Sequence, residues 1–302
     1  MARYRMKPSV FLLLCVFLLS LVSIESLFGA ERGTKITWYR ADFPPVTIPD
    51  GPRADTGFFD KAMNQIVEQL DGYQHVFAEA NFKRIMAELK NSSDVVCCPS
   101  LYKTKEREKF IAFSGPAMIV LPNGVISSKK NQEKLSPHID EDGIISIRSL
   151  LQDKKTTLGI SSGRKYSGGI DEILREFGGQ RNLVVRPGID VFKGLMAMMQ
   201  EGRIDSLLGY PIEAEYFLES NNQAGDYIYY PIKESSVEFT IGYVGCSDSP
   251  EGRQIIEQVN EIVKRYRDNT FIDYYGTWLN SATKVIHQKM AKKYYQSLGS
   301  DQ

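Results

Sequence analysis

The chain has 302 residues, of which 42% are hydrophobic and 25% are charged, and its 37 basic and 37 acidic side chains leave no formal net charge at pH 7. A chain of this length and apolar content is long enough for one large or two medium globular domains. The absence of an excess positive charge argues against a nucleic-acid-binding protein, whose surface is normally basic.

The first thirty residues have the layout of a secretory signal peptide. A few basic residues precede an apolar run over residues 10–22, and a short segment then ends near Ala30. This run is shorter than the ~20 apolar residues that a membrane-spanning helix needs. We therefore expect residues 1–30 to be removed on export to the periplasm, with an uncleaved N-terminal anchor as the alternative. Removal takes away three basic residues and one acidic residue, which changes the formal charge from 0 to −2.

Strands and helices alternate in the first half of the remaining chain. Short apolar segments predict strands at 36–39, 75–78 and 95–98, and apolar residues at helical spacing predict a helix after residue 58 and another after Asn81. Asn81 is a good N-cap residue, because its side chain can accept a hydrogen bond from the first turn. Such alternation is typical of a mostly parallel sheet that is covered by helices.

The same pattern begins again in the second half of the chain. The expected elements are a strand at 156–160, a helix at 170–177, a strand at 183–185, a helix capped by Asp190 and a strand at 205–208. The segments NFKRIMAELKNSSDVVCC and VFKGLMAMMQEGRIDSLL both run from an aromatic residue and a lysine through a helix, a polar turn and an aspartate into an apolar strand. We therefore predict two similarly built α/β lobes.

Three cysteines follow the first thirty residues: Cys97, Cys98 and Cys246. An exported protein enters an oxidising compartment, where disulfides persist. Adjacent strand residues point to opposite faces, so only one of Cys97 and Cys98 can readily reach a given partner. We expect one disulfide, from Cys97 or Cys98 to Cys246, and one buried free thiol. A redox or metal site is the alternative, but neither a C-x-x-C spacing nor a nearby histidine supports it.

A late strand is predicted at 239–244, before a long amphipathic helix that starts after Ser249. If Cys246 is bonded to the strand at 95–98, this late strand lies in the first lobe. The chain would then cross between the lobes twice. The polar tail after Thr283 is expected to be a solvated helix or a frayed end.

The segment TKEREKFIAFS, from Thr104 to Ser114, places an arginine three residues after a threonine and just before a short apolar strand. The guanidinium group of Arg107 offers five donors in a planar fork that matches a carboxylate bidentately. Taken alone, this spacing is also that of a solvated charged loop, in which Arg107 pairs with Glu106 or Glu108.

Together these segments resemble the bacterial extracellular solute-binding proteins of family 3, which have the type II periplasmic-binding fold. The matching segments are RADFPPVTI, GFFDKAMNQIVEQL, NFKRIMAELKNSSDVVCCPS, TKEREKFIAFSGPAM, GRIDSLLGY and NTFIDYYGTWL. TKEREKFIAFSGPAM is the most specific of them, because it resembles the family's T-x-x-R…F-S-x-P signature. The resemblance covers residues 35–279. It implies an α/β fold of two lobes with two interlobe crossovers, which we divide into a discontinuous first lobe (31–127 and 236–302) and a second lobe (128–235).

The resemblance also implies a ligand-binding site between the lobes. Arg107 matches the family's carboxylate-binding arginine, and Phe43 matches the aromatic residue that lies against the ligand. Ser100 falls on a position that often offers a hydroxyl or a backbone group. Tyr102 is a further candidate for the wall of the site.

Two departures from the family pattern bear on the ligand. In amino-acid binders the second-lobe strand ends in an aspartate that binds the ammonium group, whereas GRIDSLLGY has Tyr210 at this position. Arg164 and Lys165, in the loop SSGRKYSGG, lie near a helix N-terminus, where backbone N–H groups already favour anions. In the alternative interpretation both cations point to solvent. We therefore expect an acidic ligand rather than an ordinary amino acid, and a divergent subgroup of the family.

The sequence contains no recognisable enzyme motif: no G-x-S-x-G, no H-E-x-x-H and no P-loop occurs in it. We expect a monomeric periplasmic protein, without a metal or cofactor, that closes on a small anion and serves a membrane permease or a sensor protein. The alternative is a dehydratase-type enzyme of the same fold that acts on a prephenate- or arogenate-like acid, with Glu213 as a remote catalytic candidate.

Overall fold

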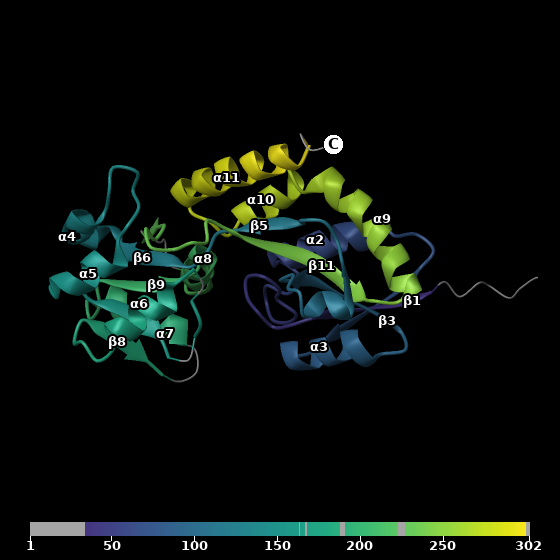
Figure 1. The fold of residues 1–302 in the computed structure, drawn as a ribbon, viewed down its shortest axis with the longest axis horizontal. Helices are drawn as coiled ribbons and strands as arrows, with labels where there is room; N and C mark the ends of the chain where they lie inside the picture. Colours follow the sequence, from purple (N-terminus) through teal and green to yellow (C-terminus); the bar gives the residue numbers. More distant parts are fainter. Residues whose placement is uncertain (1–33, 163, 167, 188–190, 223–226, 300–302) are drawn as a thin grey trace, which may run out of the picture.

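The computed structural model describes residues 34–299, except 163, 167, 188–190 and 223–226. The predicted signal peptide at 1–30 and the predicted helix cap Asp190 therefore lie outside the described residues. Two separate sheets, each flanked by helices, form two lobes that lie side by side (Figure 1). The predicted two-lobed α/β fold is confirmed. Within the described residues, no helix has both the length and the apolar character that crossing a membrane would require.

The first lobe is built on a mixed sheet. Its strands are β1 (Lys35–Arg40), β2 (Gln74–Glu79), β3 (Val95–Leu101), β4 (Ile111–Phe113), β5 (Met118–Val120) and β11 (Thr240–Ser247). They follow the order β2-β1-β3-β11-β4, and β5 pairs with the first part of β11. The parallel pairing of β1 with β2 and β3 is what the strand-helix alternation predicts. β11 is antiparallel to β3 because it returns from the second lobe in the opposite direction.

Helices cover both faces of this first sheet. They are α2 (Phe58–Val67), α3 (Phe82–Asn91), the short 3-10 turn η1 (Arg107–Lys109), α9 (Pro250–Tyr266), α10 (Thr270–Gly276) and α11 (Ser281–Gly299). The apolar faces of α2 and α3 bury residues such as Ile66 and Ile85 in the core, as the helical spacing predicts. Asn81 caps α3 as expected, because its side-chain oxygen accepts the N–H of Arg84 at 3.0 Å.

The second lobe has a five-stranded sheet in the order β10-β6-β9-β7-β8. Its strands are β6 (Gly124–Ser128), β7 (Leu158–Ser161), β8 (Leu183–Arg186), β9 (Ser206–Gly209) and β10 (Tyr227–Tyr230). Its helical segments are η2 (Lys129–Asn131), α4 (Gln132–Leu135), η3 (Ser136–His138), α5 (Ile147–Asp153), α6 (Ile170–Glu176), α7 (Val191–Gln200) and α8 (Pro211–Ser220). Each strand and helix predicted in this half of the chain has its counterpart among these elements.

The chain crosses between the sheets twice, once between β5 and β6 and once between β10 and β11. β6 pairs with β9 and β10, so it belongs to the second sheet. The lobe boundary predicted between residues 127 and 128 would cut β6. The first crossing instead lies before Gly124, where β6 begins. The first crossover is held by two tyrosine hydroxyls, since Tyr229 donates to Pro122 O at 3.1 Å and Tyr275 accepts from Leu121 N at 3.1 Å.

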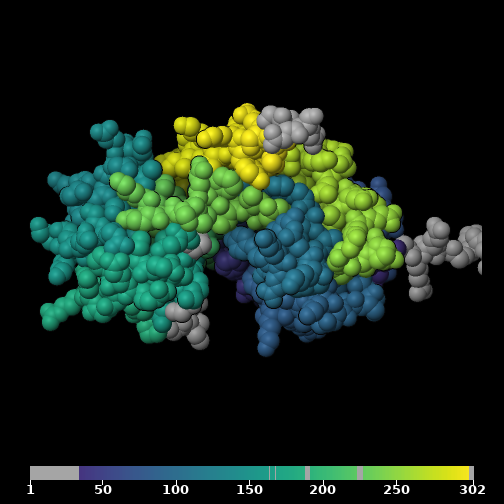
Figure 2. Space-filling model, viewed as in Figure 1, coloured from purple at the N-terminus to yellow at the C-terminus, as the bar shows by residue number. Residues whose placement is uncertain are grey.

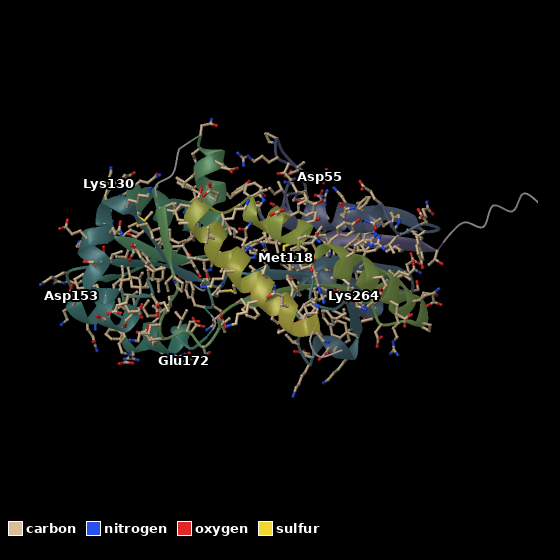
Figure 3. All side chains as sticks on the ribbon, turned by 90° about the horizontal axis from the view of Figure 1, so that it is seen from above. Asp55, Met118, Lys130, Asp153, Glu172 and Lys264 are labelled. Carbon is tan, nitrogen blue, oxygen red and sulfur yellow. A yellow bond between two sulfur atoms is a disulfide. The ribbon has the colours of Figure 1, made fainter. Side chains whose placement is uncertain are left out.

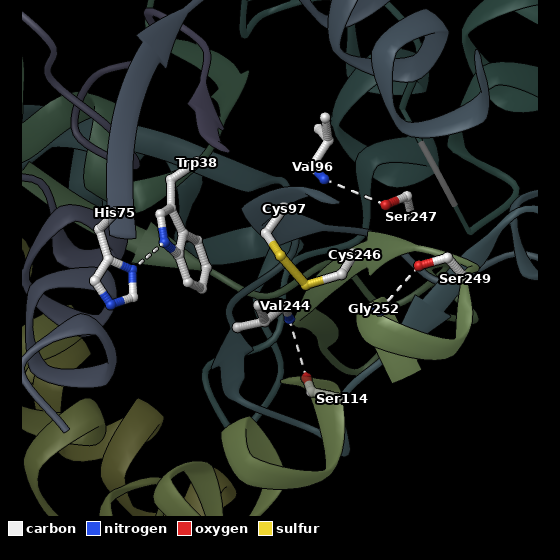
Figure 4. The surroundings of a disulfide bond; sticks show 10 residues. All are labelled: Trp38, His75, Val96, Cys97, Ser114, Val244, Cys246, Ser247, Ser249 and Gly252. Carbon is white, nitrogen blue, oxygen red and sulfur yellow. Dashed lines mark hydrogen bonds between the residues drawn. A yellow bond between two sulfur atoms is a disulfide. The ribbon is translucent and has the colours of Figure 1, made fainter. Parts of the chain in front are cut away.

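A disulfide joins Cys97 of β3 to Cys246 of β11 (Figure 4). Cys98 is a buried free cysteine. The two adjacent cysteines lie in different parts of the core, Cys97 with α2 and α9 and Cys98 with α3, as the alternation along a strand requires. The predicted pairing of one of the two with Cys246 is therefore confirmed, and the structure selects Cys97.

The tail after Thr283 is a helix, as one of the two expected alternatives has it, rather than a frayed end, but it is not solvated on all sides. It forms most of α11, which lies over the middle of the molecule between the labelled Lys130 of the second lobe and Lys264 of the first (Figure 3). Its inner face is buried: His287 Nε2 lies 2.9 Å from Ile119 O, and the Tyr295 hydroxyl donates to Ala117 O at 3.2 Å. α11 therefore covers β5 and the start of the first crossover.

Candidate ligand-binding cleft

The two lobes face each other across a hollow, which the space-filling view shows between the teal and blue halves (Figure 2). A cavity of about 230 Å³ opens on the first-lobe side. Phe43, Ser100, Tyr102 and Arg107 all line it. The structure thus brings together the four first-lobe candidates from three separate segments, and their role in binding stays a prediction.

Arg107 is positioned by the local geometry of the T-x-x-R segment. The Thr104 hydroxyl accepts the backbone N–H of Arg107 at 3.3 Å and so stabilises the turn that leads into η1. One guanidinium nitrogen of Arg107 donates to Tyr102 O at 2.9 Å. The alternative of an ion pair with a neighbouring glutamate is not observed, since Glu108 pairs with Lys103 at 3.0 Å. Among the described residues, no carboxylate lies within ion-pair distance of Arg107.

Phe43 lies in the loop between β1 and α2, which buried Asp60 holds in place. One Asp60 oxygen accepts the N–H groups of Ile48 at 2.7 Å and Gly57 at 3.2 Å, and the other accepts from Arg40 at 3.1 Å. Burial raises the pKa of Asp60, although its hydrogen bonds and the charge of Arg40 oppose this shift. Asp60 thus anchors the loop, and Phe43 within it remains 37% exposed.

Sequence reasoning missed Phe82 as a cleft residue, because the helical spacing assigned it to the apolar face of α3. In the structure Phe82 is 40% exposed, lines the same cavity and packs edge-to-face on Phe43 with ring centroids 6.4 Å apart. The available signal was its place directly after the N-cap, since the first residue of a helix lies at the edge of the core. Tyr102 adds a third aromatic side chain, which is 46% exposed.

A second cavity, of about 580 Å³, lies on the second-lobe side. Ser161, Arg164, Phe192, Lys193 and Glu213 are among its described lining residues. The sequence predicts Arg164 at this site, whereas it offers Glu213 only as a catalytic candidate. Lys193 was not singled out, because nothing in the sequence shows that the first turn of α7 borders the cleft. Lys165 is exposed and lines neither cavity.

Arg164 is not the free anion-binding cation that the sequence suggested. Its two terminal nitrogens donate to the two oxygens of Glu213 at 3.0 and 2.7 Å, and one of them also donates to Asn123 Oδ1 at 3.2 Å. Burial alone would lower the pKa of Arg164, but the charge and hydrogen bonds of Glu213 outweigh it and raise the pKa. The pair is internally neutral, so Arg164 adds no uncompensated charge to the cleft.

Tyr210 lies directly before α8 and borders the same ion pair. Its ring centroid is 5.1 Å from the Arg164 guanidinium carbon, a cation–π arrangement, and its backbone N–H donates to Glu213 at 3.0 Å. Burial raises the pKa of Tyr210, and the nearby hydroxyl of Tyr102 contributes to the same shift. Tyr210 of the second lobe and Tyr102 of the first lobe therefore approach each other across the hollow.

Comparisons with known proteins bear on the fold and the family of the chain. No curated protein sequence matches the chain significantly. Among solved structures, the chain is similar to the probable amino-acid ABC transporter extracellular-binding protein ytmK from Bacillus subtilis, with 16% identity, a TM-score of 0.58 and coverage of 83% of this chain and 99% of that one. The GlnP substrate-binding domain 2 of Lactococcus lactis, in an open conformation, gives 17% identity, a TM-score of 0.58 and coverage of 83% and 97%.

A polar amino acid ABC uptake transporter substrate-binding protein from Streptococcus thermophilus gives 20% identity, a TM-score of 0.57 and coverage of 87% and 93%. Likeness at these identities shows the fold. The model of the bacterial extracellular solute-binding proteins, family 3, matches residues 36–281, which is most of the chain. Because that match spans both lobes and both crossovers, the chain belongs to the bacterial extracellular solute-binding proteins of family 3.

Proposed function

We propose that this protein captures a small acidic ligand between its lobes outside the cytoplasm. The observation that carries the proposal is the first-lobe cavity, where Arg107 lies beside three part-exposed aromatic side chains and has no carboxylate partner among the described residues. A guanidinium group in this setting matches a ligand carboxylate bidentately. Contiguous exposed aromatic surface in a concave site is typical of ligand binding.

The charge of the cleft supports an acidic ligand. Four charged side chains line the two cavities among the described residues: Arg107, Arg164, Lys193 and Glu213. Glu213 compensates Arg164, so Arg107 and Lys193 leave the site positive. A concave site lined by one sign of charge concentrates ligands of the opposite sign.

Closure of the lobes would stabilise the bound state, because the ligand then contacts both walls of the cleft. The two lobes already touch beside it: Arg53 of the first lobe forms an ion pair with Glu219 of α8. The same Arg53 lies over the ring of Trp278, 5.7 Å from its centroid.

The partner we propose is a membrane permease, with a sensor protein as the alternative. The Bacillus subtilis and Streptococcus thermophilus proteins that share this fold are described as binding proteins of amino-acid ABC transporters, which favours the permease. The family is described as extracellular, and residues 1–30 fit a signal peptide that delivers the chain to the periplasm. A dehydratase activity has no support in the geometry, because both oxygens of its candidate residue, Glu213, are bound by Arg164.

The test is calorimetric titration of carboxylates that raise the melting temperature in a thermal-shift screen. Arg107→Ala is expected to weaken binding roughly 10- to 100-fold, because charge-assisted hydrogen bonds contribute about 1.5–3 kcal/mol. Arg84→Ala is the matched control, since Arg84 is an exposed arginine of the same lobe that pairs with Glu88. Unchanged affinity in Arg107→Ala would rule out the proposed anchor.

A further inference from the structure

Among the described residues that line the two cavities, Glu213 is the single carboxylate, and its oxygens are already engaged. Oε1 accepts from Arg164 at 3.0 Å, and Oε2 accepts from Arg164 at 2.7 Å and from the N–H of Tyr210 at 3.0 Å. A carboxylate has about four acceptor positions, so three of them are used within the protein. Little capacity is left for a positively charged group of a ligand.

Arg164 is held in place from several sides, so the pair does not open easily. The buried side chain of Asn123 accepts a hydrogen bond from its guanidinium group at 3.2 Å. The rings of Tyr210 and Tyr166 flank the group, with centroids 5.1 and 5.7 Å from its central carbon. The side chains of the pair are only 20% and 14% exposed, and a bidentate arginine–carboxylate contact of this kind is among the stronger protein ion pairs.

A ligand that carries an ammonium group would therefore enter a site with the wrong charge. It would meet the positive side chains of Arg107 and Lys193, and it would have to displace Arg164 to reach Glu213. Displacement would leave a guanidinium group partly buried without its carboxylate, which is strongly unfavourable. A ligand without an ammonium group meets neither obstacle.

We infer that the ligand is a carboxylic acid that lacks an α-ammonium group, and that the Arg164–Glu213 pair excludes amino acids. This inference rests on the proposed function and narrows its ligand class. The pair acts as a specificity determinant: it keeps the one carboxylate of the described cavity lining away from the ligand while leaving Arg107 available for the ligand's own carboxylate.

The test uses matched ligands that differ only in the amino group: 3-phenylpropionate and phenylalanine, 4-methylpentanoate and leucine, glutarate and glutamate. In calorimetric titrations of the full chain, the member without the ammonium group is expected to bind at least about tenfold more tightly in each pair that binds. Equal or tighter binding of the amino acids would overturn the inference and leave the proposed solute-binding function intact. If none of the six carboxylates binds at millimolar concentration, the proposed function fails and the inference fails with it.

Two variants test the role of the pair itself. Arg164→Gln releases Glu213, and the preference is expected to shift at least about tenfold toward the amino acid in each pair. Glu213→Gln leaves Arg164 uncompensated, and glutarate is expected to gain at least about tenfold relative to 4-methylpentanoate. Circular dichroism checks that each variant is folded, and the second variant decides the question if the first does not fold.

The Arg148–Glu176 pair provides matched controls. It lies in the same lobe with an N–O distance of 2.6 Å, and neither residue lines the two cavities. Arg148→Gln and Glu176→Gln are expected to leave all ligand preferences unchanged. If folded Arg164→Gln and Glu213→Gln also keep the wild-type preferences, the pair has a structural role only and the inference is wrong.

Discussion

His287 links the stability of the fold to pH. The side chain is fully buried between α11 and β5, where Nε2 lies 2.9 Å from Ile119 O and the ring lies 4.3 Å from that of Tyr275. Burial lowers the pKa of His287 to about 4, although the hydrogen bond to Ile119 opposes the shift. The neutral imidazole is therefore the form that the fold accepts.

This environment predicts a loss of stability in acid. Between about pH 6.5 and pH 4 the unfolded chain binds a proton at His287 and the folded chain does not, so the free energy of unfolding falls as the pH falls. The shift corresponds to up to about 3 kcal/mol. In urea unfolding at pH 7 and at pH 4.5, His287→Gln should lose about 2 kcal/mol less on acidification than the wild type. Equal losses in the two proteins would show that His287 does not carry the effect.

The local setting of Arg107 could be predicted from the sequence because it depends on short-range geometry. Thr104 and Arg107 are three residues apart, so the turn that joins them is visible in the sequence. The partner of Arg164 is not, because Glu213 is 49 residues away and reaches it only after β9 and α8 have folded. An uncompensated cation and an internally paired one look the same in a sequence.

At the level of elements, the pairing of β3 with β11 joins the N-terminal and C-terminal parts of the chain that form the first lobe. The Cys97–Cys246 disulfide crosslinks these strands across a separation of 149 residues, which includes the whole second lobe (Figure 4). Close to the disulfide, the Ser247 hydroxyl accepts the N–H of Val96 and the Ser114 hydroxyl accepts the N–H of Val244. A crosslink over so long a loop restricts the unfolded chain strongly.

Removing this crosslink should destabilise the protein without changing its fold. The double variant Cys97→Ser/Cys246→Ser is expected to lose about 2–5 kcal/mol of unfolding free energy, measured by urea denaturation. Cys98→Ala serves as the control, since it should retain the crosslinked peptide in non-reducing peptide mapping. A crosslink through Cys98, or wild-type stability of the double variant, would contradict this account.

At the level of elements, hydrophobic periodicity predicted most strands and helices, because each has one apolar face. It did not predict β5, β6, β10, α5, α8 or α10, and it did not predict that α11 is packed against the fold. The short segment of β6 could extend either sheet, and only its pairing with β9 decides which. α11 has little periodic separation of apolar and charged residues, so its burial over β5 follows from tertiary contacts such as that of Tyr295.

For the whole molecule, we propose that the ligand binds in the hollow between the lobes, which the two crossovers connect. The first-lobe cavity is lined by Phe43 and by the segment that contains Ser100 and Arg107. From the sequence, only the family resemblance indicates that these distant segments meet. α11 lies over the first crossover, and Tyr229 and Tyr275 hold that crossover by hydrogen bonds. Arg107 and the aromatic side chains around it line the first-lobe cavity instead.

The central claim is that Arg107 binds the carboxylate of an acidic ligand inside this cleft. A crystal structure of the protein with the tightest-binding carboxylate tests it most directly. The account predicts two N–H···O contacts of about 2.7–2.9 Å between the Arg107 guanidinium group and the ligand carboxylate, with the rest of the ligand against Phe43 and Phe82. A carboxylate that is bound elsewhere, with Arg107 making no contact to it, would contradict the account.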